Sequence, residues 1–310
     1  MSGETETTIP CITADEAVTL AARGALADTY GALINLDQQI DAALLGAEPV
    51  VAIGADVLAA TGAEREQIAS TVRASPIASA ALCVLLRTPT SASTGSRFAL
   101  ESATYSMLQA GPEFAAWRAA RPRRDVPRTG EPAVLVDRVG DVLHVRLNRP
   151  ERGNAVDNSL RDALTEALTI ALVDSTITSV QLTGNGNHFC TGGDLDAFDT
   201  FASPAAAHIV RLQRSPARML CVLTSRLQAH LHGNCSGSGV ELAAFAHRVS
   251  APPAATFQLP ELALGLVPGA GGTISIVNRI GAQKTAWLLL TQRRIDAPTA
   301  LRWGLIDSIA

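Results

Sequence analysis

Two glutamates, Glu241 and Glu261, stand twenty positions apart, and each lies in a largely apolar stretch. A lone carboxylate is costly to bury among apolar residues, so both are candidates for acid or base catalysis. Glu241 follows Gly237, Ser238 and Gly239, a turn of small residues that runs into a helix-like segment. Such a turn leaves backbone N–H groups unpaired, and the helix dipole adds partial positive charge there. The turn is therefore a candidate oxyanion site with a carboxylate beside it.

A second glycine-rich turn supplies further backbone donors. Residues 184–194 read Gly-Asn-Gly-Asn-His-Phe-Cys-Thr-Gly-Gly-Asp and follow the strand-like run 180–183, which leaves donors free near Gly192 and Gly193. Residues 257–272 then surround the second glutamate with proline and apolar side chains. Taken alone, Gly237 and Gly239 are more often explained as a tight turn, with Glu241 offsetting the helix dipole.

Several motifs in one order resemble the crotonase (enoyl-CoA hydratase/isomerase) superfamily. A set of ordered motifs is more specific than any single glycine-rich match. The matching segments cover about half the chain, roughly 133–310, and are Leu147-Asn148-Arg149-Pro150, Asn154-Ala155, Phe189 to Leu195, Gly237 to Ala243, and Pro260-Glu261 through Gly272.

The resemblance implies roles for individual residues. Gly193 and Ser238 would supply the two oxyanion N–H groups, although most members have glycine at the second position. Glu241 and Glu261 match the glutamate pair of the hydratases, whereas isomerases typically keep only the second. The residues expected to line the coenzyme A site are Asn154, Ala155, Val156, Thr191, Gly192 and Asp194.

These residues predict an enoyl-CoA hydratase-like lyase that adds water to a 2-enoyl-CoA thioester. Two N–H donors would stabilise negative charge on the thioester oxygen. Two carboxylates would divide the proton transfers on one water molecule. The substrate is then an acyl-CoA, and we expect no metal and no separate cofactor.

Other functions on the same fold stay open, because fold alone does not fix function. One alternative is a Δ3-Δ2 enoyl-CoA isomerase that uses Glu261 alone. Another is a cofactor-independent oxygenase or hydrolase that uses the same oxyanion hole. A third is an acyl-CoA-binding protein whose catalytic site has decayed.

Composition narrows the class of protein. The chain has 310 residues, of which 47% are hydrophobic and 17% charged, enough for a buried core in one or two domains. A net charge of −4 and the lack of a basic run argue against nucleic-acid binding. Five cysteines without CxxC spacing indicate reduced thiols and a cytoplasmic location. The N-terminus is unlike a signal peptide, and no apolar run is long enough to span a membrane.

The first part of the chain is predicted to be all-α. A capping box at 13–16 precedes apolar residues at mostly helical spacing. Further helices are expected near 64–86 and 96–110, and another begins at Gly111-Pro112. No catalytic constellation is evident there, so these helices are interpreted as packing.

An Arg- and Pro-rich segment, 121–132, predicts a boundary between a helical N-terminal region, 1–125, and a crotonase-like acyl-CoA domain, 126–310. Strand and helix patterns alternate after it, which predicts an α/β domain. The resemblance adds the ββα-spiral arrangement. The full expectation is a crotonase-like ββα spiral core preceded by an all-α N-terminal region.

Individual elements of the second domain are also predicted. A hairpin is expected between 134–136 and 142–147. A helix is expected from Asn158 to Leu172, with leucines 160, 164, 168 and 172 on one face. Residues 180–183 and part of 221–232 should be strands, and an extended apolar run should begin at Met219.

The chain departs from the family pattern at both ends. Members usually continue with several C-terminal helices, whereas this sequence stops at Ala310. Either the N-terminal helices replace that cover, or the chain is a diverged member with altered chemistry. By resemblance, the protein is expected to be a homo-oligomer, a trimer or a hexamer.

Overall fold

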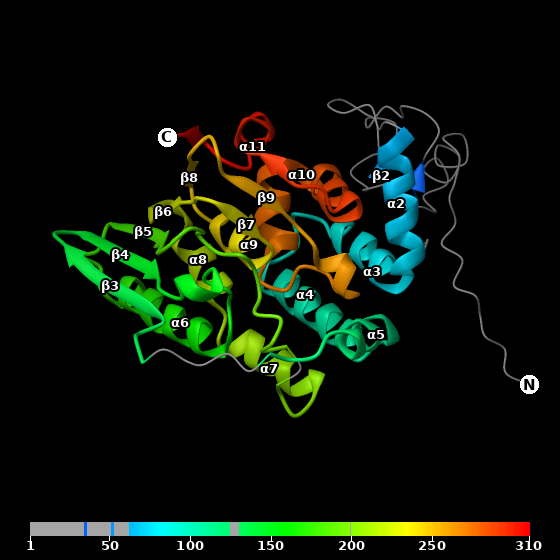
Figure 1. Cartoon of the computed structure of the whole chain (residues 1–310). Coiled ribbons are helices and arrows are strands. Elements are labelled where there is room, and N and C mark those ends of the chain that lie inside the picture. Colours follow the sequence, from blue (N-terminus) through cyan, green and yellow to red (C-terminus); the bar gives the residue numbers. More distant parts are fainter. Residues whose placement is uncertain (1–33, 36–50, 53–61, 125–129, 199) are drawn as a thin grey trace, which may run out of the picture.

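The computed structural model describes residues 34–35, 51–52, 62–124, 130–198 and 200–310 (Figure 1). The predicted capping box at 13–16 lies outside the described residues, as does most of the predicted helical stretch up to 61. Two short strands, β1 (Ile34–Asn35) and β2 (Val51–Ala52), pair in parallel within this stretch. The all-α expectation did not include them.

Four helices confirm the helical prediction from residue 62 onward. They are α2 (Gly62–Ala74), α3 (Pro76–Leu86), α4 (Thr94–Gln109) and α5 (Pro112–Ala120). The breaks between them have local causes. Proline stands at the first position of α3 and α5, where its missing N–H costs nothing. The Ser93 hydroxyl caps α4 by accepting a hydrogen bond from the Ser96 N–H at 3.1 Å.

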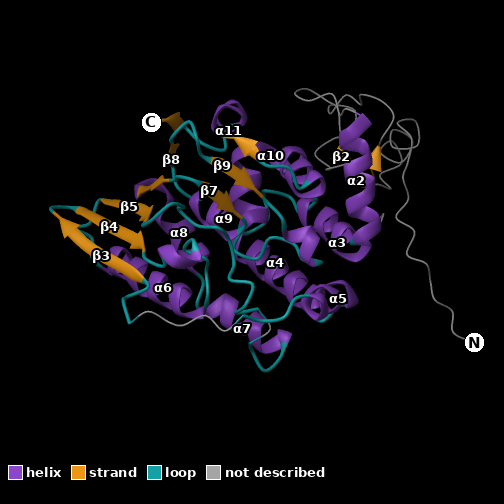
Figure 2. Cartoon of the chain, in the orientation of Figure 1, coloured by secondary structure: helices purple, strands orange, loops and turns teal. Residues whose placement is uncertain are grey.

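The largest sheet has six strands in the order β11-β8-β6-β5-β4-β3 (Figure 2). The predicted hairpin is confirmed, because β3 and β4 pair in antiparallel fashion, and the remaining neighbours are parallel. The strand bounds are β3 (Val134–Val139), β4 (Val142–Leu147), β5 (Ser179–Gly184), β6 (Leu227–His230), β8 (Arg248–Ala251) and β11 (Ser308–Ile309).

A smaller sheet has the order β10-β9-β7 and is formed by β7 (Asn234–Ser236), β9 (Thr256–Gln258) and β10 (Ile295–Asp296). Strand β7 leads directly into the short helix α9 (Ser238–Ala243), as the sequence predicted. The remaining helices are α6 (Asn158–Val173), α7 (Pro204–Gln213), α8 (Pro216–Leu223), α10 (Gly272–Thr291) and α11 (Ala297–Trp303). The described part of the chain also contains the 3₁₀ turns η2 (Pro150–Arg152), η3 (Thr224–Arg226) and η4 (Glu261–Leu264).

Two sequence predictions need correction. The run that begins at Met219 is helical, not extended, because it lies in α8. The Ser215 hydroxyl caps this helix and Pro216 begins it, while its leucines at 220 and 223 are buried. In α6, Leu172 is partly exposed and does not share the buried face of leucines 160, 164 and 168. Steps of four residues advance 40° beyond a full turn, so the fourth leucine has rotated off that face.

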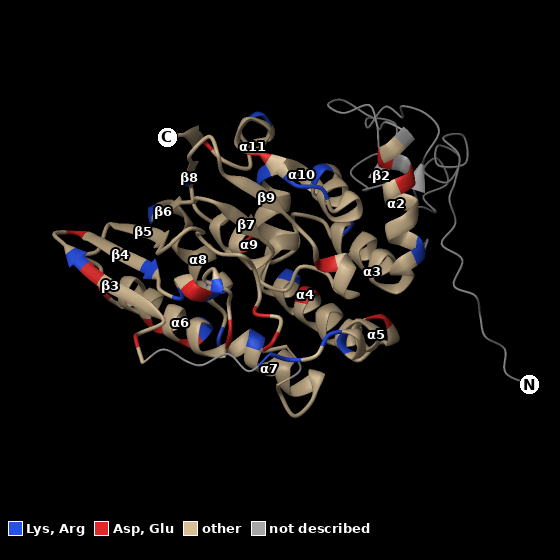
Figure 3. Ribbon diagram, viewed as in Figure 1, with Lys and Arg blue, Asp and Glu red and all other residues tan. Residues whose placement is uncertain are grey.

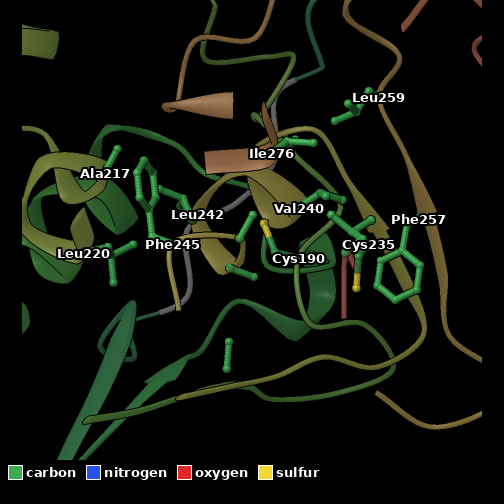
Figure 4. Close-up of a cluster of buried hydrophobic side chains, with 14 of the residues drawn as sticks. Cys190, Ala217, Leu220, Cys235, Val240, Leu242, Phe245, Phe257, Leu259 and Ile276 are labelled. Carbon is green, nitrogen blue, oxygen red and sulfur yellow. The ribbon is translucent and has the colours of Figure 1, made fainter. Parts of the chain in front are cut away.

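The N-terminal helices pack on the second domain and share its core. Helices α2 and α3 contact α10, and α4 contacts α7. The Phe98 ring in α4 stacks on Phe245, which follows α9, with ring centroids 5.9 Å apart. Figure 4 shows part of the core around α9, including Val240 and Leu242. Among the described residues, nearly all of the buried apolar side chains belong to one cluster that runs from Ile68 to Ile306, so the predicted boundary near 125 separates segments that are packed together.

Among the described helices, none alone is long and apolar enough to cross a membrane. Two consecutive helical segments, Glu66–Ala74 and Pro76–Leu86, are long and apolar enough only when taken as one, and they are bent by 108° relative to each other.

The shared core predicts that a cavity in α3 weakens the whole fold. Leu82 is fully buried, so Leu82→Ala should lower the free energy of unfolding by about 2–5 kcal/mol. Urea unfolding followed by circular dichroism should show one transition moved to lower urea. Val84→Ala, on the same helix but 40% exposed, serves as the matched control and should change little. Two separate transitions, only one of them moved, would contradict the shared core.

Candidate active site

A cavity of about 340 Å³ lies where several distant segments meet. The turn between β7 and α9, the loop after β5, and the segment from Pro260 to Ala270 form one part of its wall. Residues from α4, α6, α7 and α8 form the rest. The N-terminal helices therefore contribute to the wall of the cavity as well as to the core.

The structure places Gly193 and Ser238 side by side on this wall. The position that a Cβ would take on Gly193 is 3.9 Å from the Ser238 hydroxyl oxygen. The Gly193 loop is held by Val156, whose N–H donates to the Gly192 carbonyl at 2.8 Å and whose carbonyl accepts from the Asp194 N–H at 3.0 Å. Within the described residues, neither the Gly193 N–H nor the Ser238 N–H donates to a protein acceptor. Both donors are thus available to a ligand.

A close backbone contact fixes the turn from Gly237 to Gly239. A Cβ on Gly239 would stand 2.2 Å from the Cys190 carbonyl oxygen, so only glycine lets α9 approach the loop after β5. Cys190 and Cys235 are buried nearby in the apolar core (Figure 4). Burial raises the pKa of each thiol to about 12. Both are therefore protonated thiols at neutral pH.

The Glu241 side chain is only 2% exposed and is held by backbone donors. Its Oε2 atom accepts hydrogen bonds from the Ala270 N–H at 2.7 Å and from the Gly272 N–H at 2.9 Å. Burial raises the pKa of Glu241, and the nearby Glu261 and Glu101 raise it further, while the two backbone bonds lower it. The donors lie at the N-terminus of α10, a favourable place for a carboxylate.

Glu261 begins η4 and lies against the oxyanion turn. Its Oε1 atom is 2.8 Å from the position that a Cβ would take on Gly237. Its Oε2 atom is buried and has no hydrogen-bond partner among the described residues. The pKa of Glu261 is raised to about 8, chiefly by burial. A hydrogen bond from its own backbone lowers this pKa, and the charge of Glu101 raises it. The Glu261 carboxyl is thus mostly protonated at neutral pH.

Two residues of α4 were missed by the sequence analysis. The Glu101 carboxylate is buried and accepts from the Gly271 N–H at 2.7 Å, the Thr273 N–H at 3.0 Å and the Thr273 hydroxyl at 2.5 Å. Tyr105 lines the cavity, and its ring lies close against Gly269, where a Cβ would be 2.5 Å from a ring carbon. The sequence did carry one signal for them. Polar residues four positions apart share a helix face, and this is the spacing of Arg97, Glu101 and Tyr105.

The predicted coenzyme-binding residues divide into two groups. Val156, Thr191 and Gly192 line the cavity. Asn154 is fully buried, and its side chain accepts from the Arg149 N–H and donates to the carbonyls of 185 and 188. Asp194 is also buried and forms an ion pair with Arg152 at 2.6 Å. Asn154, Asp194 and Ala155 do not line the cavity, so the side chains of Asn154 and Asp194 fix the loops around it.

Comparison with known proteins agrees with this architecture. Residues 137–310 match the family model described as enoyl-CoA hydratase/isomerase. The chain is 33% identical over 183 residues to 2,3-dehydroadipyl-CoA hydratase of Escherichia coli (strain K12), covering 57% of this chain and 68% of that protein. It is 31% identical over 175 residues to carnitinyl-CoA dehydratase of Proteus mirabilis (strain HI4320), covering 55% of this chain and 65% of that protein.

Solved structures give the same result. The crystal structure of an enoyl-CoA hydratase from Bacillus anthracis superposes with a TM-score of 0.53 and 30% sequence identity, over 57% of this chain and 70% of that chain. An enoyl-CoA hydratase from Thermoplasma volcanium GSS1 superposes with a TM-score of 0.52 and 28% identity, over 58% of this chain and 72% of that chain. These likenesses confirm the predicted crotonase fold.

The burial of Glu261 predicts a pH dependence of stability. The folded-state pKa of about 8 lies above the ordinary value of 4.5, so the folded protein binds this proton more tightly. The resulting stabilisation is complete below the unfolded-state pKa and is lost as the pH rises through about 8. Glu261→Gln removes the titrating group and should flatten the decline between about pH 5 and pH 8.

Urea unfolding at several pH values across that window measures the effect. Each unit of pKa difference corresponds to at most about 1.4 kcal/mol. Glu66→Gln, at an exposed position of α2, is the control and should follow the wild-type profile. Parallel profiles for wild type and Glu261→Gln would show that Glu261 does not titrate in this way.

Proposed function

The chain belongs to the enoyl-CoA hydratase/isomerase family, and on that premise we propose that it adds water across the double bond of a 2-enoyl-CoA thioester. Members of this family act on CoA thioesters, which makes an acyl-CoA the expected substrate. One observation carries the proposal. Two buried carboxylates and two unpaired backbone N–H groups line the same cavity.

The two N–H groups of Gly193 and Ser238 would bind the thioester oxygen. Negative charge moves onto this oxygen when water attacks the β-carbon. Backbone donors that are already in place need no reorganisation, and one such donor contributes about 2.7–4 kcal/mol to transition-state stabilisation in other enzymes. The fixed loop around Val156 and the close contact at Gly239 keep both donors in position.

The two carboxyl groups would then take different protonation states. Burial raises the pKa of Glu241 as well, and so does repulsion from Glu261, but that repulsion is absent when Glu261 is neutral. The two backbone donors on one oxygen then favour the carboxylate at Glu241, whereas Glu261 has a buried oxygen without a donor, which suits the neutral acid. Like charges in one buried site also disfavour double ionisation. Glu241 is therefore the base that activates water, and Glu261 is the acid that protonates the α-carbon.

The proposed step balances. The water oxygen forms a bond to the β-carbon, and the water proton passes to Glu241. The carbon–carbon double bond becomes a single bond, and the Glu261 proton is transferred to the α-carbon. The pair regains its starting state by exchanging a proton between the two carboxyls or with solvent. The proposed step uses no metal and no redox cofactor.

The coenzyme would bind beside the same loops. Val156, Thr191 and Gly192 line the cavity next to the oxyanion donors, so they are the members of the predicted set that a thioester ligand would touch. In Figure 3 basic and acidic positions are interspersed along the ribbon. Homo-oligomer formation, a cytoplasmic location and the lack of nucleic-acid or membrane partners stay predictions.

Replacing either glutamate by glutamine tests the division of roles. Each change keeps the side-chain shape but removes the ionisable group. For a hydratase, Glu241→Gln and Glu261→Gln should each lower kcat by roughly 10²–10⁴-fold, with a much smaller effect on ligand binding. Loss of the conjugated thioester absorbance of crotonyl-CoA measures turnover. Calorimetry with acetyl-CoA measures binding.

Glu166→Gln is the matched control, because Glu166 is exposed on α6 and does not line the cavity. If only Glu261→Gln lowers turnover, the isomerase function replaces the hydratase. If neither change matters while a thioester is still consumed, the chemistry is that of another family class, such as a hydrolase or a cofactor-independent oxygenase. Binding without any turnover identifies an acyl-CoA-binding protein.

A further inference from the structure

Tyr105, on α4, presents an unused hydroxyl to the cavity that holds the two glutamates. Its side chain is partly buried and lines the cavity together with Glu241 and Glu261. Among the described residues its hydroxyl has no hydrogen-bond partner, and its oxygen is not one of the fully buried polar atoms. A hydroxyl that is neither paired within the protein nor sealed from the cavity is available to a ligand group or a water molecule.

Two contacts fix the Tyr105 ring before any ligand binds. The Arg211 guanidinium carbon lies 4.7 Å from the centre of the ring, as in a cation–π contact. A ring carbon lies 2.5 Å from the position that a Cβ would take on Gly269, so a side chain at 269 would push the ring away. Arg211 is in turn held on α4 by hydrogen bonds to Ser102 and Gln109. The hydroxyl is therefore preorganised, which lowers the entropy cost of binding.

The hydroxyl also lies close to the charges of the candidate active site. Burial raises the pKa of the Tyr105 phenol well above its usual range, and the charge of Arg211 lowers it. The charges of Glu241, Glu261 and Glu101 raise this pKa further. Electrostatic effects weaken with distance, so the phenol oxygen is near enough to both members of the catalytic pair to be influenced by each. The phenol is neutral at working pH and keeps a proton to donate.

Glu241 leaves one carboxylate oxygen open beside this hydroxyl. Its Oε2 atom accepts from Ala270 and Gly272, whereas its Oε1 atom has no hydrogen-bond partner among the described residues and is not fully buried. Gly269, which touches the Tyr105 ring, adjoins Ala270 in the chain. The same short segment thus holds both the ring and the carboxylate. One acceptor and one donor, both unused, face the cavity from this segment.

We propose that Tyr105 is a further catalytic residue, whose hydroxyl donates a hydrogen bond to the water oxygen that attacks the β-carbon. The inference rests on the proposed function, because it takes Glu241 as the base for this water. One lone pair of the water oxygen accepts from Tyr105, the other forms the bond to the β-carbon, and one water proton passes to Glu241. The phenol keeps its own proton throughout. In the product, the same hydrogen bond holds the new 3-hydroxyl group.

Tyr105→Phe tests the inference, because it removes the hydroxyl and keeps the ring. The kcat for hydration of crotonyl-CoA should fall by about 10- to 100-fold, since a hydrogen bond to the hydroxide-like oxygen is lost. KM should change by less than about threefold, because the phenol contacts the water and not the thioester. Met107→Leu, at a position of α4 that is 54% exposed and outside the cavity, is the control and should match wild type.

Thermal unfolding separates a catalytic role from a structural one. The hydroxyl has no partner among the described residues, so the Tm of Tyr105→Phe should stay within about 2 °C of the wild-type value. A lower Tm, with a raised KM and a lowered kcat, would show that Tyr105 only holds the cavity wall and would overturn the inference. An unchanged kcat would overturn it as well.

Two saturated thioesters that differ by one hydroxyl separate this inference from the proposed reaction. Calorimetry uses the Glu261→Gln protein, which lacks the acid of that reaction. It should bind 3-hydroxybutanoyl-CoA more tightly than butanoyl-CoA by about three- to tenfold, and adding Tyr105→Phe should abolish the preference. If this preference is found but wild type hydrates no enoyl thioester, the proposed function fails alone. If hydration occurs and the preference is absent, or survives without the hydroxyl, the inference fails alone.

A fluorine label gives a measurement that needs no change at position 105. The chain has two tyrosines, Tyr30 and Tyr105, so 3-fluorotyrosine in a Tyr30→Phe, Glu261→Gln protein reports on residue 105 alone. Its fluorine resonance should move further on binding of 3-hydroxybutanoyl-CoA than on binding of butanoyl-CoA. Equal movement with both ligands would contradict the hydrogen bond. This measurement decides the matter if Tyr105→Phe does not fold.

Discussion

The backbone from Ala270 to Thr273 is held between two buried carboxylates that come from distant parts of the chain. Glu241 binds the N–H groups of Ala270 and Gly272 from α9, and Glu101 binds those of Gly271 and Thr273 from α4. Hydrogen bonds to a charged acceptor are stronger than neutral ones, and all four donors lie at the start of α10, where the helix dipole favours negative charge. Loss of either carboxylate would leave buried donors unpaired, which costs about 1–3 kcal/mol for each group.

This constraint ties the catalytic geometry to the N-terminal helices. Because Glu101 fixes the same backbone that orients Glu241, α4 must be docked for the candidate base to be in place. The ring stack of Phe98 on Phe245 and the contact of Tyr105 with Gly269 strengthen this docking. The helical region is thus a structural part of the site.

Local signals in the sequence were sufficient for much of the fold and the site. The hairpin, α6 and the helices from residue 62 follow from turn residues, caps and apolar spacing, and the glycine turns identified the segments with free donors. The contacts that escaped prediction are long-range. Glu101 and the Gly271 N–H that donates to it are 170 positions apart, and nothing in the sequence near Glu101 indicates which backbone it will bind.

The wrong assignment of Met219 to an extended run has a different cause. A short apolar run fits a strand or a buried helix equally well, and only the cap at Ser215 and the proline after it distinguish the two. The predicted roles of Asn154 and Asp194 show a related limit. A residue type that suits a ligand contact also suits the hydrogen bonds that hold a loop, and burial alone separates the two uses.

The docking of α4 also has a consequence for how the protein responds to disturbance. Parts of a fold can open locally at a lower free energy than the whole protein unfolds. When α4 separates from α7, the Arg211 guanidinium loses its hydrogen bonds to Ser102 and Gln109, and the part of the cavity wall formed by Tyr105 and Gln109 is lost with them. The glycine turns on the central sheets are untouched by that event. Warming, or a proteolytic cut between α3 and α4, would then release the backbone around Ala270 from Glu101 in the same step, so ligand binding and turnover would fall together while the glycine turns stay formed.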